Sequence, residues 1–74
     1  NNRGIAYYNL GQYERAIEDF NEAIRLDPQY ADAYYNRGGA YYSLGQYEQA
    51  IQDYDEAIIL DRDRRLRREI DGLR

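Results

Sequence analysis

The sequence predicts an all-α fold built from helix hairpins, and three observations support this prediction. When the chain is shifted by 34 residues, residues 2–27 align with residues 36–61, and 19 of the 26 aligned positions are identical. Within each copy, apolar residues recur at steps of three and four, which is the spacing of one helix face. Valine and threonine, which favour strands, do not occur. The chain is therefore expected to contain two copies of one helical unit.

The central helix is expected at residues 30–44, and its two faces differ in chemistry. One face carries small and apolar residues, among them Ala33, Gly38 and Ala40, and is interrupted by Arg37. This face is predicted to pack against other helices. The opposite face carries aromatic, amide and hydroxyl groups, and it is predicted to contact another molecule.

In each copy a first helix is expected to end at a glycine, and a second, amphipathic helix follows. Gly11 and Gly45 can leave right-handed helical space without steric cost. Pro28 lacks a backbone N–H group and disfavours helix at Asp27, so the second helix of the first copy is expected to stop there. The apolar positions of the second helices are Tyr13, Ala16, Ile17, Phe20, Ala23 and Ile24 in the first copy, and Tyr47, Ala50, Ile51, Tyr54, Ala57 and Ile58 in the second.

Two further expectations concern what is buried in the first copy. A repeat buries its apolar face against its neighbours, so the upstream end is expected to expose side chains around Ile5, Ala6 and Phe20. Carboxylates at helical spacing, such as Asp19 and Glu22, are interpreted as the solvated face of an amphipathic helix.

The composition argues against catalysis and against metal or cofactor binding. Cysteine, histidine and lysine are absent, and Ser43 is the only serine. An enzyme needs an activated nucleophile, a tuned acid–base group or a metal, so we expect no enzyme activity, no cofactor and no metal site. No apolar run approaches the length of a membrane span, and no membrane partner is expected.

Charge is distributed unevenly along the chain, whose formal net charge is −4. Residues 1–60 carry ten carboxylates and four arginines, whereas residues 61–74 carry six arginines and four carboxylates. An acidic body disfavours a nucleic-acid partner. RNA binding through the arginine-rich tail is therefore the least favoured alternative.

A period of 34 residues made of helix–turn–helix is typical of the tetratricopeptide repeat (TPR). The positions that match the family pattern are Arg3, Gly4, Tyr7, Ala16, Phe20, Ala23 and Pro28 in the first copy, and Tyr34, Arg37, Gly38, Tyr41, Ala50, Tyr54 and Ala57 in the second. The chain thus resembles about one and three-quarter TPR repeats followed by a tail. This resemblance implies antiparallel helix hairpins that stack as a short right-handed α-solenoid.

The predicted organisation has three parts. Residues 1–29 form a first repeat that is truncated at its N-terminus, and residues 30–61 form a second repeat. Residues 62–74 form an arginine-rich C-terminal helix that either caps the array or extends its last helix.

Of these two arrangements of the tail, we favour a separate helix that folds back over Ile58 and Leu60, with Asp61 or Asp63 as its N-cap. The alternative is a second helix that runs straight through Arg62, where the family has a proline. In that case Ile59, Leu66, Ile70 and Leu73 share a seam that would require a partner chain.

Stacked first helices line the concave side of TPR arrays, so the resemblance implies a groove along the polar and aromatic face of residues 30–44 and its first-copy counterpart. The predicted partner-binding residues are Asn2, Ile5, Tyr8, Asn9, Asp32, Tyr35, Asn36, Gly39, Tyr42 and Ser43. Asparagine amides suit an extended peptide because they satisfy backbone groups that would otherwise be buried unpaired. Arg3 and Arg37 are expected to stack on nearby tyrosines or to reach carboxylates on the second helices.

The expected function is a non-enzymatic protein–protein interaction module that presents this groove to a peptide or helix of a partner protein. The alternative, from a different class, is a structural unit that assembles with copies of itself. It would form homo-oligomers through the truncated N-terminal end and the C-terminal tail.

Overall fold

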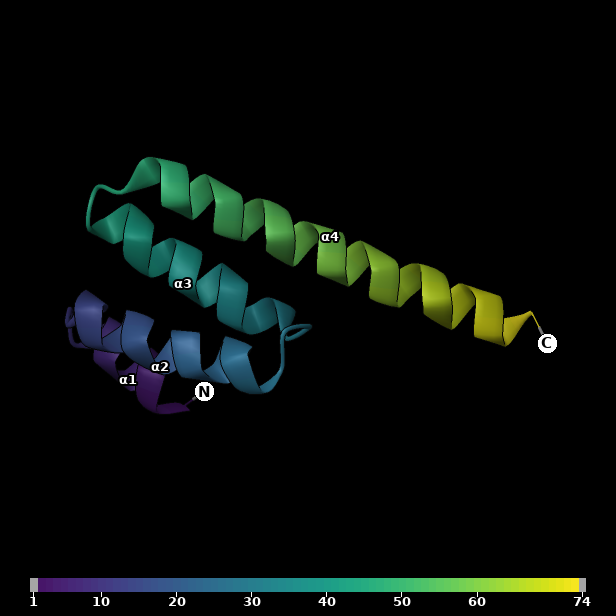
Figure 1. The fold of residues 1–74 in the computed structure, drawn as a ribbon, viewed down its shortest axis with the longest axis horizontal. Helices are drawn as coiled ribbons and strands as arrows, with labels where there is room; N and C mark the ends of the chain where they lie inside the picture. The colour runs from purple at the N-terminus through teal and green to yellow at the C-terminus, as the bar shows by residue number, and fades with distance from the viewer. Residues whose placement is uncertain (1, 74) are drawn as a thin grey trace.

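The computed structural model describes residues 2–73, and these residues form four helices and no strand. The helices are α1 (Asn2–Asn9), α2 (Tyr13–Leu26), α3 (Ala31–Ser43) and α4 (Tyr47–Gly72). As Figure 1 shows, α1 and α2 form one hairpin, and α3 and α4 form a second one. Residues 1 and 74, which the predicted first repeat and tail include, lie outside the described residues.

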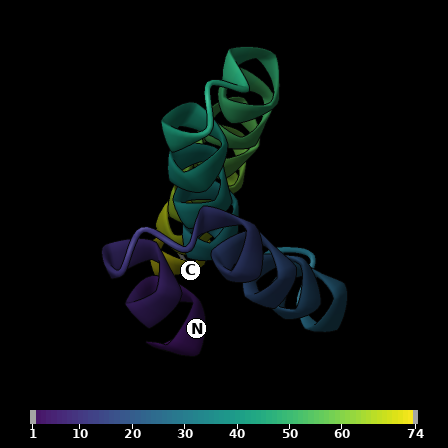
Figure 2. The same ribbon diagram turned by 90° about the vertical axis from the view of Figure 1, so that its left-hand side faces the viewer.

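The helices pack in the order in which they follow one another along the chain. α1 packs against α2, α2 against α3, and α3 against α4. Seen from the end of the molecule, α1 and α2 lie beside each other, and α3 and then α4 are stacked above them (Figure 2). Contacts between neighbouring units only are the defining property of a solenoid. The predicted fold class, an all-α solenoid of stacked helix hairpins, is confirmed.

The turn inside each hairpin depends on a glycine in the left-handed region of backbone space. Gly11 has φ +78° and Gly45 has φ +81°. In the first turn, the Gln12 N–H donates to the carbonyl of Tyr7 at 2.9 Å, and the Gly11 N–H donates to that of Tyr8 at 3.0 Å. The same pair of bonds recurs in the second turn. This is the Schellman arrangement, which satisfies the last carbonyl groups of a helix.

The connection between the hairpins is set by the proline. α2 ends at Leu26, and Asp27 is already extended, with φ −143° and ψ 91°. The N–H of Gln29 donates to the side-chain Oδ1 of Asp27 at 3.1 Å, which closes the turn around Pro28. The expected stop at Asp27 is therefore observed.

The core consists of small residues on facing helices with one aromatic ring between them. Its buried apolar members are Ala16, Phe20, Ala31, Ala33, Ala40, Ala50 and Ala57. Gly38 is buried, whereas Tyr42 is exposed, so the packing face and the open face of α3 are those that the sequence predicts.

The expectation that Phe20 is exposed at the upstream end is wrong. Its ring is fully buried, although Ile5 and Ala6 on α1 are exposed as expected. The reason is Gly4, which lets α1 lie directly on the ring. A β-carbon at Gly4 would come within 2.6 Å of Phe20 Cε1.

The expectation that the tail forms a separate helix folded back over Ile58 and Leu60 is also wrong. α4 runs without interruption from Tyr47 to Gly72, and its C-terminal half projects beyond the other helices (Figure 1). Asp61 and Asp63 lie inside this helix and cap nothing. No proline breaks the helix at Arg62, and an uninterrupted run of 26 residues is about 39 Å long.

We expect Gly4→Ala to lower the free energy of unfolding by about 1–3 kcal/mol, because the added methyl group would overlap the buried Phe20 ring. Urea denaturation followed by circular dichroism measures this effect. Gly72→Ala is the matched control, since a β-carbon there would meet no atom within 4 Å. Equal stability of Gly4→Ala and the unmodified chain would contradict the close approach of α1 to α2.

Candidate functional site

A hollow of about 280 Å³ opens between the first helices of the two hairpins. Its walls come from α1 and α3, and its remaining lining comes from the second helices. The lining residues are Ile5, Tyr8 and Asn9 from α1, Phe20 from α2, Tyr35, Asn36 and Gly39 from α3, and Tyr54 from α4. We call this hollow the groove.

The groove brings together six of the ten residues that the sequence predicts for partner binding: Ile5, Tyr8, Asn9, Tyr35, Asn36 and Gly39. The other four are exposed but do not line it: Asn2, Asp32, Tyr42 and Ser43. The Tyr42 ring instead lies edge-on against Tyr47 of α4, with ring centroids 5.2 Å apart. All ten residues remain predictions for partner binding.

The sequence reasoning missed the two groove residues that come from the second helices. The sequence places Phe20 and Tyr54 only among the apolar positions of the second helices. They occupy equivalent positions in the two copies, 34 residues apart. The available signal was the size of their side chains, which are much larger than those of Ala16 and Ala50. A side chain of this size can fill the space inside a hairpin and still border the groove.

Close contacts between rings and backbone shape the groove. Tyr8 lies against Gly39, where a β-carbon would come within 3.2 Å of the tyrosine hydroxyl oxygen. The rings of Tyr35 and Tyr54 have centroids 5.4 Å apart and are tilted by 53°. Burial raises the pKa of the Tyr54 hydroxyl above its usual value, with smaller contributions from Tyr35, Tyr8 and Tyr42. None of the lining residues is charged, so the groove is an amphipathic and neutral surface.

Each hairpin is fastened by an arginine on its first helix and an aspartate on its second. Arg3 Nε and Nη2 donate to the two carboxylate oxygens of Asp19 at 2.8 and 2.7 Å. Arg37 binds Asp53 with the same atoms at the same distances. A bidentate pair of this kind is both strong and geometrically specific. The interpretation of Asp19 as part of the solvated face is wrong, because Asp19 is buried against Arg3.

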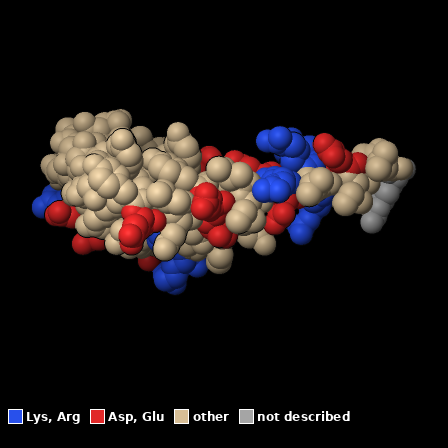
Figure 3. Space-filling view, turned by 90° about the horizontal axis from the view of Figure 1, so that it is seen from above, with Lys and Arg blue, Asp and Glu red and all other residues tan. Residues whose placement is uncertain are grey.

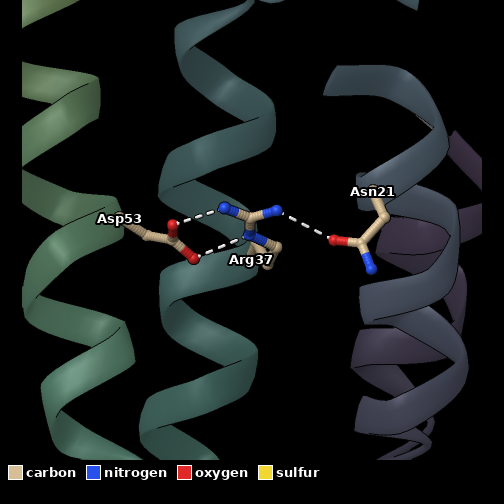
Figure 4. Close-up of polar contacts among 3 residues, drawn as sticks. All are labelled: Asn21, Arg37 and Asp53. Carbon is tan, nitrogen blue, oxygen red and sulfur yellow. Dashed lines mark hydrogen bonds and ion pairs between the residues drawn. The ribbon is translucent and has the colours of Figure 1, made fainter. Parts of the chain in front are cut away.

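Arg37 also connects the two hairpins. Its Nη1 donates to the side-chain oxygen of Asn21 on α2 at 2.9 Å, so one guanidinium joins α2, α3 and α4 (Figure 4). The same group lies over the rings of Tyr34 and Tyr41, at 5.4 and 5.9 Å from their centroids. The hydrogen bond to Asp53 is the main cause that raises the pKa of Arg37. Both expected roles of this arginine, stacking on tyrosine and reaching a second-helix carboxylate, are therefore observed.

The projecting end of α4 is a mixed-charge surface rather than a uniformly basic one. Figure 3 shows Arg and Asp or Glu atoms interleaved along it. Residues 61–73 contain five arginines and four carboxylates, so little net charge remains to attract a polyanion. Within residues 2–73 the structure has no helix suited to crossing a membrane and no group of side chains that would hold a metal ion.

We expect Arg37→Ala to lower the free energy of unfolding by about 3 kcal/mol, because it leaves the Asp53 carboxylate buried without its partner. Chemical denaturation measures this change. The double variant Arg37→Leu with Asp53→Leu should recover most of the loss, since no charge is then left buried. Arg25→Ala is the control for an exposed pair, here with Glu22, and should cost less than about 1 kcal/mol. A double variant no more stable than Arg37→Ala would contradict this account.

The stability of the protein should depend on pH in the acid range through Asp19. The hydrogen bonds from Arg3 lower the pKa of this carboxyl group below its usual value, so the folded state binds its proton less readily than the unfolded state. The stabilisation is complete above the ordinary pKa of an aspartate, about 3.9, and is lost as the pH falls through the lower folded value. Urea denaturation at a series of pH values should show this decline, and Asp19→Asn should reduce its slope. An unchanged slope in Asp19→Asn would show that other carboxylates cause the decline.

Comparison with known proteins adds evidence that does not depend on the geometry. Two sequence patterns of the same family match the chain. One, described as TPR repeat, matches residues 4–45, and the other, described as tetratricopeptide repeat, matches residues 31–64. An uncharacterized protein of Methanocaldococcus jannaschii is 47% identical to the chain over 34 residues. The matched segment covers 46% of this chain and 40% of that relative.

Proposed function

Since this chain belongs to the tetratricopeptide repeat family, whose repeats generally mediate protein–protein interactions, we propose that it is a non-enzymatic module that binds a peptide or helix of a partner protein in the groove. The observation that carries this proposal is the hollow between α1 and α3, with its neutral lining of tyrosine rings and asparagine amides. In this family the stacked first helices face the ligand, and the hollow lies between the first helices α1 and α3.

The chemistry of the groove favours a particular kind of partner segment. Tyr8, Tyr35 and Tyr54 offer flat apolar surface with hydroxyl groups at the edge, which suits an aliphatic or aromatic side chain. The amides of Asn9 and Asn36 lie at the same hollow and can both donate to and accept from the partner's backbone. We therefore propose that an apolar anchor residue enters the hollow while its backbone is held by the asparagines.

The groove lacks the features that would select an acidic ligand. No arginine lines it, and the chain has no lysine. Arg37 is held by Asp53 and Asn21, and Arg3 is held by Asp19. A partner that depends on its carboxylate groups would meet no cation in the hollow. The proposed ligand is thus neutral or apolar at its point of contact.

The proposal is tested by selecting a peptide-display library against the 74-residue chain and measuring the affinity of the selected peptides. Peptides that bind the groove should carry a recurrent apolar residue. Their affinity should fall at least about tenfold in Tyr35→Ser, which removes one aromatic wall of the groove. Glu18→Ala, an exposed change on α2 away from the groove, is the matched control and should leave the affinity unchanged.

Circular dichroism of both variants must first show equal helicity. Selected peptides that bind Tyr35→Ser as tightly as the unmodified chain would show that the groove is not the binding surface. Peptides selected for acidic rather than apolar residues would contradict the proposed ligand chemistry.

A further inference from the structure

The internal repeat shows which helix faces are covered in one copy and open in the other. α2 is packed against α1 inside its own hairpin and against α3 of the next hairpin. α4 is packed against α3 inside its own hairpin, and this contact is the equivalent of the one between α2 and α1. Tyr13, Ile17 and Ile24 on α2 are half-buried. Their counterparts on α4 are Tyr47, Ile51 and Ile58, and these are 57%, 59% and 58% exposed. The open surface of α4, formed by Tyr47, Ile51, Asp55 and Ile58, is called the α4 outer face.

The same comparison identifies the complementary surface on α1. The side chain of Arg37 on α3 is 21% exposed, but that of its counterpart Arg3 on α1 is 74% exposed. Ala40 is fully buried and Leu44 is half-buried, whereas their counterparts Ala6 and Leu10 are exposed. The surface formed by Arg3, Ala6 and Leu10 is called the α1 outer face. It is the first-copy equivalent of the surface with which α3 covers α2.

We propose that two copies of this chain dock head to tail, with the α1 outer face of one copy covering the α4 outer face of the other. The contact repeats the packing of α3 on α2 that already exists inside each chain. Among the residues that form the two outer faces, one differs between the copies, and it carries the strongest argument for a second copy as the occupant.

That residue is Asp55, which stands where the first copy has Asn21. Inside the chain, Arg37 Nη1 donates to the Asn21 side chain across the junction of the hairpins at 2.9 Å. In the docked pair, the exposed Arg3 of one copy would meet Asp55 of the other. A hydrogen bond from a charged guanidinium to a neutral amide is thereby replaced by one between two opposite charges, which is the stronger interaction. The two outer faces are therefore complementary in charge as well as in apolar surface.

The course of α4 explains why its own C-terminal residues 61–72 leave this face open. Residues 61–72 continue the helix in a straight line, so no described segment turns back onto Ile51 and Ile58. The contact joins two different surfaces and is heterologous. The docked pair still presents one open outer face at each of its two ends, so growth continues beyond the dimer.

The test uses two variants, each blocked at one face. Ile51→Asp with Ile58→Asp blocks the α4 outer face, and Ala6→Glu with Leu10→Glu blocks the α1 outer face. All four positions are exposed, and circular dichroism should confirm that both variants fold. Sedimentation equilibrium of the unmodified chain should show an average mass that rises steadily with concentration. Each blocked variant should keep the mass of one chain, and a mixture of the two should form a dimer that does not grow.

Further variants test the charge pairing at the contact and serve as controls. Asp55→Arg places two arginines at the contact and should weaken association at least about tenfold, whereas Asp55→Asn, which restores the residue of the first copy, should retain it. Leu66→Asp with Ile70→Asp changes the projecting tail and should leave association unchanged. Tyr35→Ser in the groove should also associate normally, which separates this proposal from the one on peptide binding.

Three outcomes would overturn the proposal. The first is a single-chain mass for the unmodified protein at every concentration. The second is self-association of the variant blocked at the α1 outer face, since this would indicate a symmetric contact between two α4 helices. The third is loss of association in the tail variant, which would place the contact on the projecting end of α4.

Discussion

The close approach of a glycine on one helix to an aromatic ring on the next is the constraint on which this structure depends. Gly4 lies on Phe20, and Gly38 lies on Tyr54, where a β-carbon would come within 3.0 Å of the ring. Because no side chain stands between them, the paired helices come close enough for Arg3 and Arg37 to reach Asp19 and Asp53. The rings of Phe20 and Tyr54 fill the hairpins and also border the groove, so the same contacts form part of its lining.

The elements that followed from local sequence signals were predicted well. Gly11, Gly45 and Pro28 act through their own backbone preferences, and the turns and the end of α2 fall where these residues place them. The continuous course of α4 was the less favoured of the two predicted arrangements, since the sequence between Asp61 and Asp63 is compatible with both a cap and a helix interior. An aspartate can act as an N-cap only where the preceding helix has ended, and the residues around Asp61 and Asp63 do not end it.

The errors about Phe20 and Asp19 have a common cause. Amphipathic periodicity separates the faces of a single helix, but it does not tell how much of either face a neighbouring helix covers. Asp19 lies on the polar side of α2, and it is buried because Arg3 closes over it from α1. Six residues of the groove were predicted because the repeat aligns α1 with α3, whereas Phe20 and Tyr54 required the depth of the hairpin to be known.

The position of Arg37 has a consequence for how the protein comes apart. In an array of stacked units, the interface between neighbours decides whether they melt one after another or together. One guanidinium here holds α2 through Asn21 and α4 through Asp53, so separating the hairpins also disturbs the pair inside the second hairpin. Fraying that starts at α1 can therefore stop at this residue, and beyond it residues 31–60 should exchange their amide protons as one cooperative unit.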